Sequence, residues 1–236
     1  MSDEDFDLDR LAAYLHLMPA QVARLAERGK LPGRRVADQW RFSRPEIHHW
    51  LEHRIGLSDQ EELVEMENVL DQSAAGTRPA VTIAEVLPIE AVAVPLTART
   101  RGSVITGMVE IAARTGWLWD QVKMVEAVKA REDMHPTALD SGVALLHPRR
   151  PMANILGEAF VALGRTSGGI PFGGGGGRLT DVFFLILSTD DDWHLRVLAR
   201  LSRLIGSGGL LDELRQAADA HDALEVIARH EASLPG

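Results

Sequence analysis

Two apolar stretches in the second half of the chain each lead into a histidine. Residues 141–151 read SGVALLHPRRP, and residues 181–205 read DVFFLILSTDDDWHLRVLARLSRLI. Each begins with a short apolar run bounded by glycine, serine or aspartate, which is typical of a buried strand. His147 directly follows the first run, and His194 opens the helical pattern after the second.

The sequence around these stretches alternates between strand-like and helical patterns. Strands are predicted at 91–94, 142–146, 160–164 and 181–187, and helices at 104–115, 118–131, 194–205, 210–217 and from 222 onward. Such alternation predicts an α/β domain built on a mixed sheet.

The order of these features resembles one type of phosphotransferase-system (PTS) IIA domain, the fructose, mannitol and nitrogen-regulatory type (EIIA type 2). A helix ends in the KARE segment 129–132, a strand ends at His147, and an apolar strand precedes a His-Leu pair at 194–195. The resemblance implies an α/β mixed-sheet sandwich over 80–236 that accepts a phosphoryl group. By this resemblance His147 is the phosphorylated residue, and Arg131 and His194 lie beside it. It also implies the PTS histidine phosphocarrier protein as a partner.

These residue types suit phosphoryl transfer. An imidazole has an ordinary pKa of about 6.5, so its neutral, nucleophilic form is abundant near neutral pH. A transferring phosphoryl group needs positioning and cationic partners more than covalent help. Arg131 would supply a bidentate clamp, and His194 would donate an N–H beside the free amides of a helix N-terminus. Phosphohistidine transfer is therefore the most enzymatic activity that we expect.

The chain departs from the pattern of these IIA domains around His147. Leu146 replaces a proline, Pro148 replaces a small residue, and the loop at 133–140 lacks the usual Ser-Thr-Gly composition. Arg149 and Arg150 follow, and their charges would favour an anion. A second interpretation therefore stays open, in which the domain binds a partner or an anion without carrying phosphate.

The first 55 residues have the pattern of a winged helix-turn-helix domain. Apolar residues at helical spacing predict a helix from Leu8, and Pro19 begins a second helix that ends at Gly29. Residues 34–42 predict a two-stranded wing, and Ser43 begins a third helix. This half resembles the excisionase-like branch of the MerR superfamily, most specifically in its GKLPGRRV and WRFSRPEIHHWL segments.

The charge of this region predicts double-stranded DNA as a partner. The whole chain has a net charge of −9, yet nine lysines and arginines stand against four acidic residues between Arg10 and Ile55. Such asymmetry indicates one module that meets a polyanion. The predicted DNA contacts are Gln21, Arg24 and Arg28 on the second helix, and Arg34, Arg35 and Arg41 on the wing. A protein-docking role for this basic face is the alternative.

A linker with a short helix is predicted at 56–79, between the two domains. Histidines at 48, 49 and 53 with Glu46 suggest a metal site only weakly, and we predict no metal and no organic cofactor. The glycine run at 173–177 lacks the lysine of a phosphate-binding loop, so a hairpin-like loop near the site is predicted instead.

Bulk properties exclude several other classes of protein. The 236 residues include no cysteine, 45% are hydrophobic and 25% are charged, so a folded chain without disulfides or thiolate sites is expected. No apolar run reaches the roughly 20 residues that span a bilayer, and the acidic N-terminus is unlike a signal peptide. We therefore expect a cytoplasmic protein without membrane contact. One such DNA-binding module binds weakly, which favours a homo-oligomer.

Overall fold

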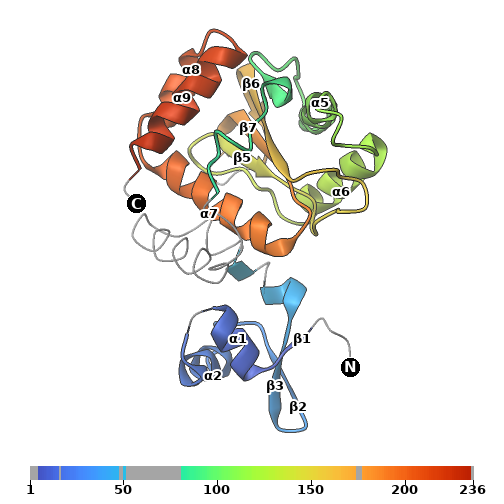
Figure 1. Ribbon diagram of the computed structural model, residues 1–236, viewed down its shortest axis with the longest axis vertical. Helices are drawn as coiled ribbons and strands as arrows, with labels where there is room; N and C mark the ends of the chain where they lie inside the picture. Colours follow the sequence, from blue (N-terminus) through green and yellow to red (C-terminus); the bar gives the residue numbers. More distant parts are fainter. Residues whose placement is uncertain (1–4, 16, 48–49, 52–80, 174–176, 235–236) are drawn as a thin grey trace. The chain divides into compact units, whose positions relative to one another are not determined.

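The chain divides into two compact units, Met1–Ala80 and Val81–Gly236. Figure 1 shows the computed structural model. The structure describes residues 5–15, 17–47, 50–51, 81–173 and 177–234. The predicted linker at 56–79 lies outside these ranges.

The described part of the first unit contains helices and a small sheet. Its elements are β1 (Asp5–Phe6), α1 (Leu8–Tyr14), α2 (Pro19–Glu27), β2 (Arg34–Val36) and β3 (Gln39–Ser43). Residues 44–47 and 50–51 are also helical. Strand β3 lies between β1 and β2 and is antiparallel to both. The order of two helices followed by a two-stranded hairpin matches the sequence prediction.

Local sequence signals explain where α2 begins and ends. Pro19 is its first residue, a position where the missing N–H of proline costs nothing. Gly29 follows the helix with a φ of 65°, and the amide of Lys30 donates to the carbonyl of Leu25 over 2.9 Å. This is a Schellman cap, which glycine favours because it has no Cβ to clash. The predicted end of the helix at Gly29 is therefore confirmed.

Phe42 of β3 is the centre of the small core in the first unit. It is fully buried, as are Leu11 of α1, Val22 of α2 and Ile47. A Cβ on Gly33 would lie only 2.6 Å from the ring of Phe42. Position 33 therefore requires glycine, and the Leu-Pro-Gly turn before β2 is shaped by this packing.

Strand β1 was not predicted. The sequence suggests only an acidic tail before the first helix, but Asp5 pairs with Ser43 and Phe6 pairs with Phe42. Phe6 is buried and stacks on Tyr14 at a centroid distance of 5.0 Å. A two-residue strand has no readable periodicity, and its partner lies far along the chain.

The second unit is a mixed sheet covered by helices on both sides. Its strands are β4 (Val92–Ala93), β5 (Val143–Leu146), β6 (Phe160–Pro171) and β7 (Leu179–Leu187), in the order β4-β6-β7-β5. Its helices are α5 (Arg101–Ala113), α6 (Gln121–Met134), α7 (Asp191–Gly206), α8 (Leu210–Gln216) and α9 (Ala220–Ala232). Figure 1 shows α5 and α6 on one side of the sheet, and α7, α8 and α9 on the other.

Helices on both faces explain why the strands read as continuous apolar runs. Side chains alternate between the two faces of a strand. Phe183 and Leu185 of β7 belong to the core that includes Met108 of α5 and Val128 of α6. Phe184, between them, points to the opposite face and is equally buried. The predicted mixed sheet is confirmed: β5 is parallel to β7, and β6 is antiparallel to it.

Strand β6 is longer than predicted. The apolar pattern ends at residue 164, but pairing with β7 resumes at Ile170 after a register shift that begins at Arg165. Residues 165–171 contain two glycines and a proline, which locally favour a turn. The long β6–β7 hairpin overrides that preference, and residues 174–176 of the predicted glycine loop lie outside the described residues.

We expect Ala37→Asn to stabilise the first unit. Ala37 and Asp38 link β2 to β3 with φ values of 49° and 62°, a left-handed turn that strains an alanine. Asparagine tolerates this conformation, so the free energy of unfolding should rise by about 0.5–1 kcal/mol. Urea unfolding of the full chain, followed through the Phe42 amide NMR signal, measures the change.

Ala37→Val provides the matched comparison at the same exposed position. A β-branched residue is disfavoured at positive φ, so this variant should be less stable than the wild type. Equal stability of the two variants would show that the turn is not strained at this position.

Candidate functional site

His147 and His194 lie side by side beyond the ends of two neighbouring strands. His147 follows β5 directly, and His194 lies in the first turn of α7, which follows β7. The parallel pairing places Leu146 opposite Leu185, so both strands end at the same edge of the sheet. The two imidazole rings have a centroid distance of 4.9 Å and an interplanar angle of 60°.

Hydrogen bonds around His147 define the state of its two ring nitrogens. Nδ1 lies 2.9 Å from the carbonyl oxygen of Leu145, which can only accept a hydrogen bond. Nδ1 therefore carries the proton in a neutral ring. The other nitrogen, Nε2, accepts a hydrogen bond of 3.2 Å from Nε of Arg131. The lone pair of His147 is thus on Nε2, facing the arginine.

Arg131 completes the group predicted from the sequence. It lies in the last turn of α6, and its Nη1 donates to the carbonyl oxygen of His135 over 2.7 Å. The alternative prediction for Arg131 was a surface ion pair with Glu132 or Glu126. Instead, the arginine is buried and contacts His147.

The start of α7 holds His194 in place. The carboxylate of Asp190 caps the helix by accepting a 2.9 Å hydrogen bond from the amide of Trp193. Nδ1 of His194 lies 3.2 Å from the hydroxyl of Ser188, the first residue after β7. His194 is thus fixed from both the strand end and the helix.

All three side chains are enclosed in this conformation. The exposed fractions are 2% for His147, 5% for His194 and 7% for Arg131. A phosphoryl donor would therefore reach Nε2 of His147 only after surrounding side chains move. Arg149 and Arg150, immediately after Pro148, are exposed.

A buried carboxylate next to Arg131 was not predicted as part of the site. Glu132 has a fully buried side chain and accepts hydrogen bonds from the amide and the hydroxyl of Thr137. Nη2 of Arg101, the first residue of α5, lies 3.8 Å from Oε2 of Glu132 and 3.2 Å from Asp133. Two signals for Glu132 were available in the sequence: it belongs to the KARE segment of the resemblance, and an acidic residue in the last helical turn opposes the helix dipole.

Burial raises the pKa of Glu132 above its ordinary value. Hydrogen bonds from Thr137 and the charges of Arg101 and Arg131 act in the opposite direction, but they offset the loss of hydration only in part. The folded second unit therefore binds a proton at Glu132 more tightly than the unfolded chain does.

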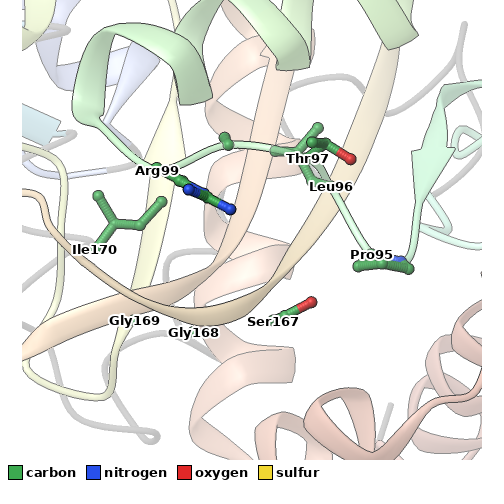
Figure 2. Close-up of a pocket in the computed structure, with 9 residues that line it drawn as sticks. Pro95, Leu96, Thr97, Arg99, Ser167, Gly168, Gly169 and Ile170 are labelled. Carbon is green, nitrogen blue, oxygen red and sulfur yellow. The ribbon is translucent and has the colours of Figure 1, made fainter.

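A separate pocket of about 400 Å³ lies in the second unit, away from the histidines. Figure 2 shows the segment 95–99 on one side of it and β6 residues 167–170 on the other. Ile170 pairs with Thr180 near the start of β7, whereas His147 lies beyond the end of the neighbouring β5. The pocket contains none of the predicted site residues.

The three predicted contacts on α2 lie on its exposed side. Gln21, Arg24 and Arg28 are all exposed, while Val22 and Ala26 are buried. Oε1 of Gln21 accepts a 2.8 Å hydrogen bond from the amide of Met18, just before the helix. The side-chain carbonyl oxygen of Gln21 therefore caps the start of α2. The side-chain NH2 group is the part that can face a ligand.

The predicted contacts on the hairpin have partners within the first unit. Nη2 of Arg34 forms a 2.9 Å ion pair with Asp5, and Nη2 of Arg41 donates to Gln39 over 3.0 Å. The Arg35 guanidinium lies 5.3 Å from the ring centroid of Trp40. Arg34 and Arg35 nevertheless keep 67% and 57% of their side-chain surface exposed. Such exposed pairs are weak, so a phosphate can compete for these groups.

Two kinds of feature are absent from the described residues. None of the helices there is both long and apolar enough to cross a membrane. The same parts of the chain hold no cluster of three His, Asp or Glu side chains suited to a metal ion. The histidines at 48, 49 and 53 lie outside the described residues.

The fold and the paired histidines define a IIA-type domain, and sequence comparison assigns the family. Residues 85–230 match the family described as "Phosphoenolpyruvate-dependent sugar phosphotransferase system, EIIA 2". This chain belongs to that family. Residues 6–54 match the family described as "Helix-turn-helix domain". The EIIA type 2 resemblance and the helix-turn-helix class of the first unit are therefore confirmed, whereas the excisionase-like branch stays a prediction.

Two characterised proteins are similar to the second unit. The fructose-specific EIIABC component of the PTS from Bacillus subtilis (strain 168) is 26% identical over 151 residues. The match covers 63% of this chain but only 23% of that protein. A nitrogen regulatory protein from Bradyrhizobium diazoefficiens is 31% identical over 123 residues, covering 50% of this chain and 78% of that protein.

Solved structures support the fold of the second unit. The nitrogen regulatory protein IIA-Ntr from Neisseria meningitidis has a TM-score of 0.55 at 22% identity, covering 61% of this chain and 98% of its own. IIA mannitol from Escherichia coli has a TM-score of 0.53 at 18% identity, covering 59% of this chain and 97% of its own. At these identities the comparison establishes the α/β fold alone.

We expect Glu132→Gln to change how stability depends on pH. Because folding raises the pKa of Glu132, the wild-type free energy of unfolding falls as pH rises through the range between the ordinary and the raised value. Glutamine has no such titration. The stability of the variant relative to wild type should therefore increase as pH rises above the ordinary glutamate pKa of about 4.3.

Urea unfolding followed through NMR signals of β7 amides measures this difference. Glu213→Gln is the control with the opposite sign, because hydrogen bonds from Arg229 and His230 lower the pKa of Glu213. Its stability relative to wild type should decrease as pH rises toward the ordinary glutamate pKa of about 4.3, and should stay constant above it. If the free energy of unfolding of Glu132→Gln minus that of wild type stays constant or falls as pH rises, the raised pKa of Glu132 is contradicted.

Proposed function

We propose that this chain is a phosphorylation-responsive transcription regulator. Its IIA domain, 80–236, accepts a phosphoryl group on Nε2 of His147 from the PTS histidine phosphocarrier protein. Its helix-turn-helix domain, 1–55, binds double-stranded DNA, and the protein acts in the cytoplasm as a homo-oligomer. The phosphoryl group changes the affinity for DNA.

The observation that carries this proposal is the arrangement of His147 and Arg131. With Nδ1 bonded to the Leu145 carbonyl, Nε2 holds the lone pair that a nucleophile needs. The Arg131 guanidinium faces that nitrogen at 3.2 Å, where phosphoryl oxygens would arrive. A cation placed before the reaction stabilises the charge of the transferring group without reorganisation.

The bonds formed and broken in this transfer balance with the donor phosphohistidine and His147 alone. The Nε2 lone pair of His147 attacks the phosphorus, a new N–P bond forms, and the N–P bond in the donor phosphohistidine breaks. Electrons of the breaking bond return to the donor imidazole. The proton on Nδ1 of His147 stays in place, where it donates to the Leu145 carbonyl.

The proposed DNA contact rests on charge and on exposure. Gln21, Arg24 and Arg28 lie on one exposed side of α2, the position of a recognition helix. Arg34, Arg35 and Arg41 on the hairpin would bind phosphates, because their intramolecular pairs are partly exposed to solvent.

A second candidate function is favoured by the burial of the histidine. With 2% of its surface exposed, His147 is poorly placed for a phosphocarrier, and Pro148 removes a backbone donor next to it. In this alternative the IIA domain binds a partner protein or small anion and carries no phosphate. The chain would then remain inert toward the phosphorylated phosphocarrier.

We expect wild-type protein to gain one acid-labile phosphoryl group when incubated with phosphoenolpyruvate, enzyme I and the histidine phosphocarrier protein. His147→Ala should abolish the gain, because it removes the nucleophile. Arg131→Ala should slow it by about 100- to 1000-fold, the usual effect of removing one transition-state donor. Intact-mass spectrometry under neutral conditions measures both.

His221→Ala is the control, because His221 is exposed on α9 and should be phosphorylated normally. Label that persists on His147→Ala would refute the assignment of the acceptor. An inert wild type would favour the binding alternative.

DNA binding should depend steeply on salt, and the phosphate contacts should set that dependence. For a mixed-sequence duplex, Arg35→Ala should reduce the slope of log K against log salt by about 1. Arg24→Gln should cost about 1–3 kcal/mol on a selected site if it reads a base. Fluorescence anisotropy across a salt series measures both.

Arg114→Ala removes the same charge from the exposed end of α5 and should leave the slope unchanged. If Arg35→Ala and Arg114→Ala behave alike, the hairpin is not a DNA contact, and the protein-docking interpretation is favoured.

A further inference from the structure

Residues 135–138 form a short segment between the end of α6 and the start of the loop that leads to β5. At its first residue, the carbonyl oxygen of His135 accepts a 2.7 Å hydrogen bond from Nη1 of Arg131. Near its end, Ala138 pairs with Ala144 in an antiparallel bridge on the edge of β5. The segment thus touches both the arginine of the site and the strand that ends at His147.

Glu132 fixes the middle of this segment. Its carboxylate accepts hydrogen bonds from the Thr137 amide, at 3.2 and 3.3 Å to its two oxygens, and another from the Thr137 hydroxyl. The Glu132 side chain is fully buried, and Nη2 of Arg101 lies 3.8 Å from it. A buried carboxylate is costly unless it is paired, so these bonds resist any displacement of Thr137.

The carbonyl of Thr137 continues the connection to the histidine. It accepts a 3.4 Å hydrogen bond from the amide of Leu145, the residue whose own carbonyl bonds Nδ1 of His147. Thr137 is therefore bonded to Glu132 through its amide and hydroxyl. Its carbonyl is bonded to β5, the strand that ends at His147.

We propose that Glu132 and Thr137 are positioning residues that hold the Arg131 guanidinium against Nε2 of His147. They touch neither the histidine nor a phosphoryl group in any contact described above, and they act through the 135–138 segment. The inference rests on the proposed phosphoryl transfer and assigns a role to residues beyond the site itself.

Displacement of the guanidinium should affect transfer more than docking. Arg131 faces Nε2, so its position matters when the phosphoryl group moves, whereas the buried Glu132 offers no surface for docking. A misplacement of about 1 Å costs up to about 100-fold in rate. The maximal rate should therefore fall while KM for the phosphocarrier stays nearly constant.

Two pairs of variants test this in the full-length protein. Thr137→Val keeps the shape but loses the hydroxyl, and Thr137→Ser keeps the hydroxyl. Glu132→Met loses both acceptors, and Glu132→Gln keeps one. We expect the Val and Met variants to transfer phosphate about 10- to 100-fold more slowly, and the Ser and Gln variants to keep most of the wild-type rate.

A second readout does not depend on phosphorylation. A hydrogen bond to His147 slows exchange of the Arg131 Nε–H proton with water, so its NMR signal reports the position of the guanidinium. Thr137→Val should broaden or shift this signal, and Thr137→Ser should not. Thr115→Val, which removes a hydroxyl bonded to the Ala112 carbonyl, is the control and should leave the Arg131 signal unchanged.

The outcomes separate this inference from the proposed function. If wild type accepts phosphate and Thr137→Val matches it in rate and in the Arg131 signal, the positioning role is overturned. A rise in KM without loss of maximal rate also overturns it. If wild type accepts no phosphate, the proposed function fails, and the Arg131 signal in the two Thr137 variants still decides whether Thr137 positions the arginine.

Discussion

The parallel pairing of β5 with β7 is the constraint on which the histidine site depends. Because both strands run in the same direction and in register from Val143 and Val182, they end together at one edge of the sheet. His147 follows one strand end directly, and the other leads through a short connection to the first turn of α7. A shift of one residue in this register would turn the apolar side chains of β5 to the opposite faces and move His147 away from His194.

Arg131 reaches the same place from a helix, and its charge must be compensated because it is buried. Two described contacts do this: the bond to Nε2 of His147 and the bond to the His135 carbonyl. Glu132, the next residue, is also buried. The attraction between its carboxylate and Arg131 lowers the pKa of Glu132 and so opposes the effect of burial in part. Oppositely charged groups in a region without water stabilise each other only when their geometry is fixed. Under the proposal above, residues 135–138 fix that geometry.

Elements with strong local signals could be predicted, and those made by distant partners could not. Adjacent residues in the sequence specify the start of α2 at Pro19 and its end at Gly29. The same is true of the apolar runs that form β5 and β7. Strand β1 has two residues and exists because Phe42, far along the chain, offers it a partner. Local glycines in β6 likewise favour a turn, but its hairpin with β7 continues past them.

The same distinction applies to the site. His147, Arg131 and His194 were predicted because their sequence contexts match a family pattern, and the structure brings these three side chains together. The bond between Glu132 and Thr137 had no such marker. Its partners are five residues apart across a helix end, where neither helical nor strand periodicity applies. Glu132 itself belongs to the KARE segment that carries the resemblance, and an acid there opposes the helix dipole, but its role depends on burial that a sequence does not display.

Phosphorylation of Nε2, as proposed, would consume the lone pair that now accepts the Arg131 hydrogen bond. The arginine would lose one acceptor and gain phosphoryl oxygens, which carry a charge of about −1.5 to −2 near neutral pH. These oxygens would extend beyond Nε2 into the space next to the guanidinium, so the guanidinium would have to move away from the ring. Its bond to the His135 carbonyl, and through that segment the bonds of Thr137, would have to adjust. Under this proposal, the segment at 135–138 would be where a chemical change at the histidine first becomes a change in the backbone.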